Sequence, residues 1–426
     1  MIAASSFLNT QSRVFFALLA VVYFTTDAIA NRLPRSGDVR DGYESTNYVT
    51  RSESLKERAG TAIDLYEAAN TPQLGIPPTT HSLDNPLNRA GIELGRRLFF
   101  DRRLSINDTM SCAICHVPEM GFAHNELEIS VGVEGRSARR NAPTILNVAY
   151  KNMLFHDGRE TTLENQVWIP MLARNEMANP SIGYVIQKLN NLKDYDGLFE
   201  KAFNRSASME TIGMALAQYQ RTLISANSRF DRWYYGGEKD LLTEQEQLGF
   251  EIFMGKGMCS TCHLVGEEYA LFTDNLLHNT GFGYDIAMAS EPPTYRVQLA
   301  PGTFVDVKKE LIDSVSQDRG IKRNDLGRYE VTENPDDLWK YLTPTLRNIA
   351  LTAPYMHNGK LASLEEVIEF YDQGGIANMR LSPLIKKLAL QPDEKTALVS
   401  FLKTLTGANV VELAGDAFAA PVGDVQ

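Results

Sequence analysis

Cysteine is scarce in this chain of 426 residues, which has only Cys112, Cys115, Cys259 and Cys262. So low a count excludes a small scaffold held together by many disulfides. Basic residues are also in deficit, with 42 Lys and Arg against 53 Asp and Glu, and the net charge of −11 disfavours nucleic acid and anionic membranes as partners. Strand-like alternation and long apolar runs are scarce as well. The remaining composition, 43% hydrophobic and 22% charged, is that of a packed globular protein. A length well above about 150 residues indicates two or more domains.

The N-terminus carries the parts of a secretory signal peptide over residues 1–30. An apolar run of 11 residues, 14–24, follows Arg13 and precedes Ala28-Ile29-Ala30, which fits an A-x-A cleavage site. A comfortable membrane span needs about 20 apolar residues, so an uncleaved anchor is the weaker alternative. The sequence therefore predicts a periplasmic protein without a stable membrane span after cleavage.

The rest of the chain reads as two related, mostly α-helical halves. Residues 31–86 form an N-terminal extension and linker, with a short helix expected over 55–69 and a proline-rich stretch after it. Helical periodicity predicts one long helix over 209–235, and capping signals at Thr243 and Ser363 open two later helices, before a last helix over 392–405. The expected domains are 87–236 and 237–410, the second with an irregular insertion over 284–335, and then a tail over 411–426.

Both halves contain the pentad Cys-x-x-Cys-His, as CAICH over 112–116 and CSTCH over 259–263. This spacing is typical of c-type haem attachment, in which two thiols bond the haem vinyl groups and the adjacent histidine ligates iron. A redox dithiol needs no following histidine, and a zinc site in each half would need a further ligand. Two covalent haems, with His116 and His263 as proximal ligands, are the favoured interpretation because the two pentads account for every cysteine.

The segments around these pentads resemble the bacterial dihaem cytochrome c peroxidase and MauG superfamily. The resemblance covers roughly residues 88–406 and rests on motifs that occur in the same order: LGRRLFFDRRLSINDTMSCAICH, RRNAPTILN, FHDGRETTLENQ, TPTLRNIALTAPYMHNG and SLEEVIEFYDQGG. It implies two cytochrome c-like haem domains packed around an inter-haem interface, the first haem reacting with peroxide and the second transferring electrons.

The resemblance also implies catalytic residues on the segment after the Asp-Gly-Arg motif. Glu176 matches the acid–base group that moves a proton between the peroxide oxygens, Gln166 matches a residue that positions peroxide, and Pro170 matches the same pattern. Without the resemblance, Glu176 would be a solvated carboxylate at a helix end.

Two departures point toward the MauG branch of this superfamily. Peroxidases often hold a second histidine on the first haem, but the matching segment ISVGVEGRSARRN contains none. Peroxidases also place a methionine over the second haem, whereas the matching residue is Tyr371, an iron ligand in MauG-type enzymes. Spacing alone favours a core position for Tyr371, because Leu364, Ile368 and Tyr371 recur on one helix face.

Other matched positions concern the space between the haems. His156 replaces the tryptophan that bridges the two haems in the superfamily, and is either a propionate partner or a structural histidine. His357 is expected near the edge of the second haem. Asn141, Thr352 and Pro354 match calcium ligands, although Asn141 alone could be a turn residue. The tryptophan that MauG carries before its second pentad is absent here, so the route to a substrate must differ.

These features predict a MauG-like enzyme that uses H2O2 to form a high-valent, bis-ferryl-type state. That state would oxidise an aromatic residue, Trp by preference, of a partner protein by long-range electron transfer. The style is that of the methanobactin-associated dihaem enzymes (MbnH-like). The alternatives are a dihaem cytochrome c peroxidase that takes electrons from a small cytochrome, and a non-enzymatic dihaem electron carrier.

Overall fold

The computed structural model describes residues 60–79, 82–124, 127–288, 294–300, 303–308, 311 and 324–419. The expected signal peptide and residues 31–59 of the extension lie outside these residues. The described part is mostly α-helical, as predicted, and its helices are α3 (Leu65–Asn70), α4 (Arg89–Phe100), α5 (Cys112–Cys115), α6 (Leu163–Gln166), α7 (Trp168–Leu172), α8 (Ile182–Asn190), α9 (Leu198–Phe203), α10 (Met209–Arg221), α11 (Arg229–Tyr234), α12 (Glu244–Met254), α13 (Phe282–Met288), α15 (Tyr329–Thr332), α16 (Leu364–Asp372), α17 (Pro392–Lys403) and α18 (Val410–Ala419).

Short elements complete the described part. There are two antiparallel strand pairs, β1 (Leu277–His278) with β4 (Tyr341–Leu342), and β2 (Thr294–Ala300) with β3 (Thr303–Lys308). The 3-10 turns are η3 (Arg102–Leu104), η4 (Pro118–Met120), η5 (Val133–Gly135), η6 (Val148–Tyr150), η7 (Lys193–Tyr195), η8 (Cys259–Thr261), η9 (Pro335–Asp337) and η10 (Ile349–Leu351). None of the described helices is both long and apolar enough to cross a membrane.

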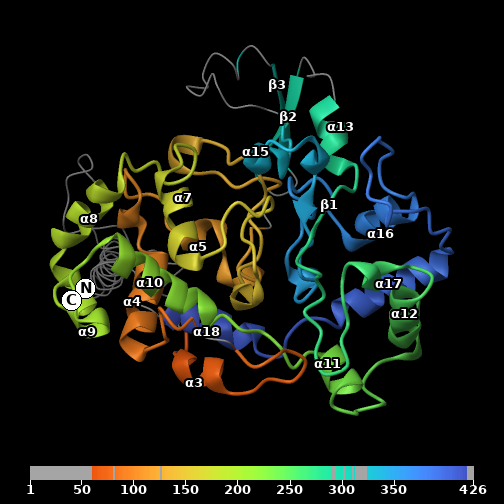
Figure 1. Ribbon diagram of the computed structural model, residues 1–426, viewed down its shortest axis with the longest axis horizontal. Helices are drawn as coiled ribbons and strands as arrows, with labels where there is room; N and C mark the ends of the chain where they lie inside the picture. The colour runs from red at the N-terminus through yellow and green to blue at the C-terminus, as the bar shows by residue number, and fades with distance from the viewer. Residues whose placement is uncertain are drawn as a thin grey trace, which may run out of the picture. The chain divides into compact units, whose positions relative to one another are not determined.

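A crossed helix pair, α4 with α10, organises the first hydrophobic core (Figure 1). Asn88 and Ser208 cap the two helices, each with its side-chain oxygen accepting a backbone N–H. The helices approach so closely that a Cβ on Gly95 would lie 1.9 Å from the carbonyl oxygen of Ala215. One turn later, the rings of Phe99 and Tyr219 pack with centroids 5.2 Å apart. Glycine is therefore required at position 95 to let the backbones meet.

The second core repeats this arrangement with α12 and α17 (Figure 1). The predicted capping box at Thr243 and Glu246 opens α12. A Cβ on Gly249 would lie 2.1 Å from the Ala397 carbonyl oxygen, and the Phe253 and Phe401 centroids are 5.2 Å apart. The same spacing of glycine and aromatic residue thus builds the same crossing twice.

The loops that follow the pentads also repeat. Thr144 donates to the carbonyl oxygen of Gly121, and Thr345 donates to that of Leu271. Three residues after each threonine stands an asparagine in the left-handed region, Asn147 and Asn348. These matching bonds give the two halves the same loop architecture between the pentad and the closing helix.

Helix α18 occupies part of the segment that the sequence analysis assigned to a tail. Val410, Leu413 and Ala417 of this helix pack into the first core rather than the second. Asp416 binds Arg96 on α4 at 2.6 Å and accepts the backbone N–H of Ile63. The C-terminal segment thus returns to cover the first half, an arrangement that local periodicity does not reveal.

The single helix expected over 209–235 is wrong, because the structure divides it into α10 and α11. Ser225 N–H donates to the Asn147 side chain, and the Asn227 side chain accepts the N–H of Leu74. Asn227 has a φ of +54°, and Ser228 then caps α11 in a capping box with Asp231. Short polar side chains that bind backbone groups compete with helix continuation, which is why the helix breaks here.

The insertion expected over 284–335 is more regular than predicted in its described residues. It contains the end of α13, the β2–β3 hairpin and α15. The strand sequences TYRVQLA and TFVDVK are rich in β-branched and aromatic residues, which favour strands. This alternation is hard to recognise in the sequence because Pro292, Pro293 and Pro301 flank the first of the two strands.

Candidate functional site

The two pentads lie in the same local geometry. His116 Nδ1 is 3.1 Å from the Phe122 carbonyl oxygen, and His263 Nδ1 is 2.9 Å from that of Phe272. A ring nitrogen bound in this way carries the proton, which leaves Nε2 to ligate a metal. Burial lowers the pKa of His116 to about 4 and also lowers that of His263, so both imidazoles are neutral donors.

The cysteines of the pentads are free thiols, and none forms a disulfide. Burial raises the pKa of Cys112 and of Cys259 to about 12, and that of Cys115 to about 11. Such thiols are poorly suited to thiolate redox chemistry. Each pair faces a cavity beside its histidine, which fits covalent haem attachment.

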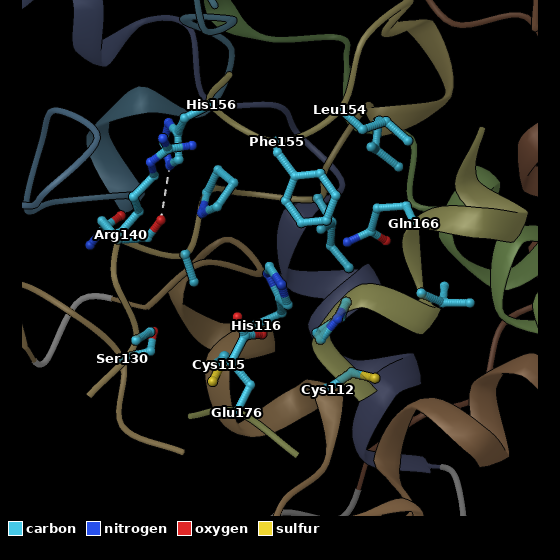
Figure 2. Close-up of a pocket in the computed structure, with 18 of the residues that line it drawn as sticks. Cys112, Cys115, His116, Ser130, Arg140, Leu154, Phe155, His156, Gln166 and Glu176 are labelled. Atoms are coloured by element: carbon cyan, nitrogen blue, oxygen red, sulfur yellow. Dashed lines mark hydrogen bonds between the residues drawn. The ribbon is translucent and has the colours of Figure 1, made fainter. Parts of the chain in front are cut away.

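The first cavity, of about 370 Å³, is lined by Cys112, Cys115 and His116 and by all three residues expected to act on peroxide, Gln166, Pro170 and Glu176. Figure 2 shows Gln166 and Glu176 in its wall. Gln166 ends α6 and Pro170 lies in α7, while Glu176 follows α7 in the next turn. The backbone of Glu176 is fixed because its carbonyl accepts the N–H of Val133 at 2.9 Å. A Cβ on Gly132 would lie 2.2 Å from the Asn175 carbonyl oxygen, so glycine is needed for this close approach.

Among the carboxyl groups that line this cavity, Glu176 differs because it forms no ion pair with a described residue. Burial raises its pKa, and Arg159 partly opposes the effect. The other lining carboxylates are paired, Asp157 with Arg140 and Arg159, and Glu330 with Arg139. Among the described residues no hydrogen bond reaches the Glu176 carboxyl, so it is available to a ligand in the cavity.

The histidines that line the first cavity are His116 and His156. His156 Nε2 is 2.9 Å from the Asn141 carbonyl oxygen, the contact drawn in Figure 2, and burial lowers its pKa to about 4. This ring is held in the cavity wall by the backbone. In the described part of the chain, no free histidine stands in the cavity to oppose His116.

The second cavity, of about 260 Å³, is lined by the second pentad, Tyr371 and His357. Tyr371 projects from α16, burial raises its pKa, and no described residue hydrogen-bonds its hydroxyl. Two methionines, Met258 and Met356, also line this cavity. Met356 is a possible ligand that was not predicted, although its place in the PYMHNG motif is visible in the sequence.

His357 and His156 occupy equivalent loops of the two halves. The residue before each histidine has a positive φ, +71° at Met356 and +65° at Phe155. The His357 ring stacks on Tyr341 with centroids 3.8 Å apart, and its Nε2 is buried with no hydrogen-bond partner in the described part of the chain. An unsatisfied buried nitrogen beside the cavity fits a polar ligand group there.

The positions expected to bind calcium converge in part. Asn141, Thr352 and Pro354 all line the second cavity, and Asn141 lines the first as well. The Asn141 N–H donates to the His357 carbonyl, and its side-chain amide donates to the Glu128 carbonyl. Asn141 therefore ties the two histidine loops together whether or not it also binds a cation.

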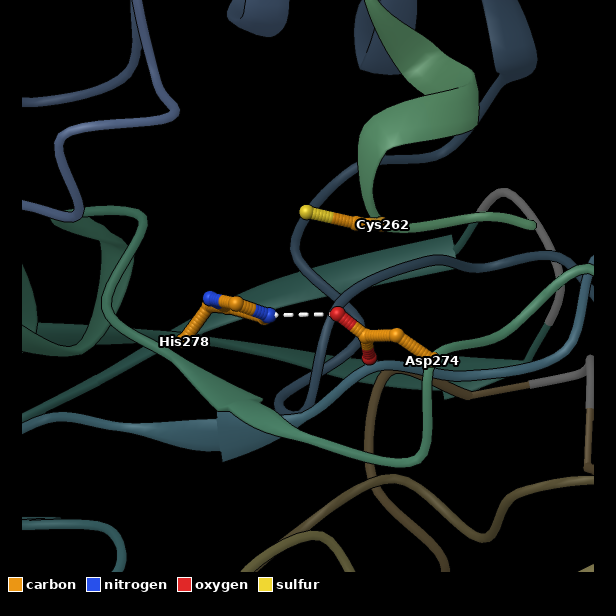
Figure 3. A group of neighbouring side chains, drawn as sticks. All are labelled: Cys262, Asp274 and His278. Carbon is orange, nitrogen blue, oxygen red and sulfur yellow. Dashed lines mark hydrogen bonds and ion pairs between the residues drawn. The ribbon is translucent and has the colours of Figure 1, made fainter.

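A different cluster groups three possible metal ligands, Cys262, Asp274 and His278 (Figure 3). His278 Nε2 is 2.7 Å from Asp274 Oδ2, and hydrogen bonds with Cys262 and then with Asp274 raise the pKa of His278 to about 9. Cys262 belongs to the second pentad, so haem attachment would convert its sulfur to a thioether. His278, which lines the second cavity, then keeps Asp274 as its partner.

The two cavities share a wall. The residues that line both are Asn141, Ala142, Pro143, Thr144, Lys151 and His156. A polar side chain in this wall can interact with a ligand in either cavity. Lys151 is the shared residue that the sequence analysis did not single out.

Comparison with known proteins agrees with this geometry. Residues 89–240 match the family described as di-haem cytochrome c peroxidase. Cytochrome-c peroxidase IdrP1 of Pseudomonas sp. (strain SCT) is 36% identical over 343 residues, which are 79% of this chain and 86% of the relative. Methylamine utilization protein MauG of Methylorubrum extorquens is 34% identical, over 76% of this chain and 80% of its own. The crystal structure of a MauG-like protein associated with microbial copper homeostasis is 31% identical with a TM-score of 0.61, covering 80% of this chain and 95% of that one.

Proposed function

Because the chain belongs to the di-haem cytochrome c peroxidase and MauG family, and is thus a haem-dependent, peroxide-driven oxidoreductase, we propose that it is a MauG-like enzyme. It uses H2O2 to oxidise an aromatic residue, Trp by preference, of a partner protein. The observation that carries this proposal is the contrast between the cavities. The first holds an unpaired carboxyl and no free histidine opposite His116, while the second holds an unpaired phenol, Tyr371, as far as the described residues show.

Two c-type haems fit the residues present, and they would supply the redox chemistry of peroxide cleavage. Cys112, Cys115 and His116 would hold one haem, and Cys259, Cys262 and His263 the other. Tyr371 would bind the iron of the second haem. The phenolate is a hard anionic ligand that favours oxidised iron, so it would oppose reduction of that centre.

In the first cavity, Glu176 accepts the proton from the inner oxygen of H2O2 and returns it to the outer oxygen, so that water leaves. Burial raises its pKa above that of an exposed glutamate, which makes the carboxylate a stronger base for the proton of the inner oxygen. Gln166 orients the peroxide through its side-chain amide, and Pro170 shapes the wall beside it.

The same proposal includes a calcium site, export of the chain and oxidation of a protein partner. Asn141, Thr352 and Pro354 would offer oxygen ligands to a Ca²⁺ ion beside the shared wall, and neutral oxygens of this kind suit calcium. Residues 1–30 would export the chain to the periplasm, the compartment in which the pentads could meet haem. The protein partner would be oxidised from a distance by electron transfer.

The first test uses the diferric holoprotein and one equivalent of H2O2, without reductant. Loss of both ferric EPR signals together would support storage of oxidising equivalents by both centres. A protein that stays inert until one haem is reduced would overturn the proposal. Comparing exported proteins from cells with the wild type and with Glu176→Gln would then reveal a Trp or Tyr whose mass rises only with the wild type.

A cytochrome c peroxidase is the second candidate, because Met356 lines the second cavity and several relatives carry that name. A methionine ligand would raise the reduction potential of the second haem and suit electron uptake from a small cytochrome. Near-infrared spectra of Tyr371→Phe and Met356→Leu distinguish the two, since only the variant that lacks the true ligand changes the ligand-to-iron band.

A further inference from the structure

Lys151 lies in the wall shared by the two cavities and lines both of them. It directly follows the η6 turn, and its backbone N–H donates to the Val148 carbonyl. The neighbouring Tyr150 hydroxyl donates to the Pro77 carbonyl at 3.0 Å, which anchors the turn. The backbone is thus fixed at the point where the lysine side chain enters the wall.

The ammonium group of Lys151 has no counter-charge in the described part of the chain. The other Lys and Arg side chains that line the first cavity are paired: Arg139 with Glu330, Arg140 with Asp157 and Asp325, and Arg159 with Asp157. Lys386 of the second cavity is exposed to solvent.

Burial without compensation is costly for a charged group, and it is the cause that lowers the pKa of Lys151 to about 8. The Lys151 side chain is partly accessible, and Lys151 lines both cavities. An anion that occupies the cavities would remove this cost. The group that the family places in both cavities is haem, whose propionates are carboxylates.

We propose that Lys151 is a positioning residue that binds haem propionate from the shared wall, so that one ammonium group pairs with a carboxylate of each haem and offsets part of their charge. The neighbouring polar groups of the wall do not compete for this role. His156 Nε2 is engaged by the Asn141 carbonyl, and the Asn141 amide by the Glu128 carbonyl. A single cation between two centres also couples them, because a change of charge at either one acts on the same ammonium.

The experiment measures the reduction potential of each haem by spectroelectrochemistry in Lys151→Met, Lys151→Arg and a control, Lys201→Met. Lys201 is exposed on α9 and absent from both cavity linings, yet its substitution removes the same charge. Loss of a buried cation beside a haem disfavours the reduced state. We expect an effect on the order of tenfold on each reduction equilibrium, which is about 59 mV per electron.

Both potentials should fall in Lys151→Met, while Lys151→Arg and Lys201→Met stay near the wild type. Resonance Raman spectra should show shifted propionate bending modes in Lys151→Met and Lys151→Arg, because an ammonium and a guanidinium bind a carboxylate differently. Potentials and propionate modes that match the wild type in both Lys151 variants overturn the proposal. If the methionine variant fails to mature, the propionate modes of the arginine variant decide alone.

This inference rests on the presence of two haems and not on the proposed oxidation of a partner. The potentials and Raman spectra are measured without peroxide. Failure here would therefore leave the proposed function intact, and failure of the peroxide experiment would leave this inference intact.

Discussion

Replacing Glu176 by Gln tests the proposed acid–base step with little change in shape. The side chain is half-buried in the wall of the first cavity, and its carboxyl has no hydrogen-bond partner among the described residues. Glutamine keeps the volume and removes the cost of a buried carboxylate, so the variant should be at least as stable as the wild type. Any loss of peroxide reactivity would then reflect chemistry and not unfolding.

The size of the loss follows from the lack of a substitute base in the same cavity. Asp157 and Glu330 line the cavity but are held by arginines, and the ring nitrogen of His156 is engaged by a backbone carbonyl. A positioned acid–base group contributes about 10²- to 10⁴-fold. With no replacement among the described residues, we expect Glu176→Gln to lower the second-order rate with H2O2 by at least about a hundredfold, which is about 2.7 kcal/mol of activation free energy.

Stopped-flow mixing of the diferric protein with H2O2, followed by Soret absorption, measures this rate. Glu93→Gln, an exposed carboxyl on α4, is the matched control and should react like the wild type. The ionised form of Glu176 accepts the proton, so the wild-type rate should fall as pH drops below its raised pKa, whereas the variant should be slow and insensitive to pH. A Glu176→Gln protein that reacts within about threefold of the wild type would refute this role.

Three further changes test the second cavity, a helix crossing and a buried ion pair. Tyr371→Met should raise the reduction potential of one haem by on the order of a tenth of a volt or more in potentiometric titration, and an unchanged potential would mean that the phenol is not a ligand. Gly249→Ala places a Cβ 2.1 Å from the Ala397 carbonyl oxygen, so thermal unfolding should show a loss of about 1–3 kcal/mol, and a stable variant would contradict the close helix crossing. Asp231→Asn leaves the guanidinium of Arg347, which is 1% exposed, without its carboxylate partner at 2.9 Å, and denaturant unfolding should show a loss of about 3–5 kcal/mol. A small change there would mean that water reaches the pair.

Much of the fold was predictable because the information is local. The pentads, the capping box at Thr243 and the cap at Ser363 each lie within a few residues of the feature that they specify. The two pentads likewise predicted that the chain consists of two related halves. Gln166, Pro170 and Glu176 were expected together from motif order, and one cavity contains all three.

Features that depend on distant partners could not be predicted. Helix α18 packs into the first core, and its Asp416 pairs with Arg96, which lies 320 residues earlier in the chain. Helical periodicity carries no information on so distant a pair. The break after α10 depends on Asn147, which lies in another loop. In the sequence Lys151 has no distinguishing feature, and only the structure shows that it lines both cavities.

The duplicated architecture indicates where the two halves acquire different chemistry. Both pentad histidines donate to the carbonyl of a phenylalanine, and both histidine loops turn through a residue with positive φ. The halves differ in the segments after those loops: the first half continues into α6 and α7 and presents Glu176, whereas the second continues into α16 and presents Tyr371. Substitutions in these segments change the side chains that line each cavity. They leave the pentad histidines and the helix crossings unchanged. A single duplicated scaffold can therefore present a carboxyl group in one cavity and a phenol in the other.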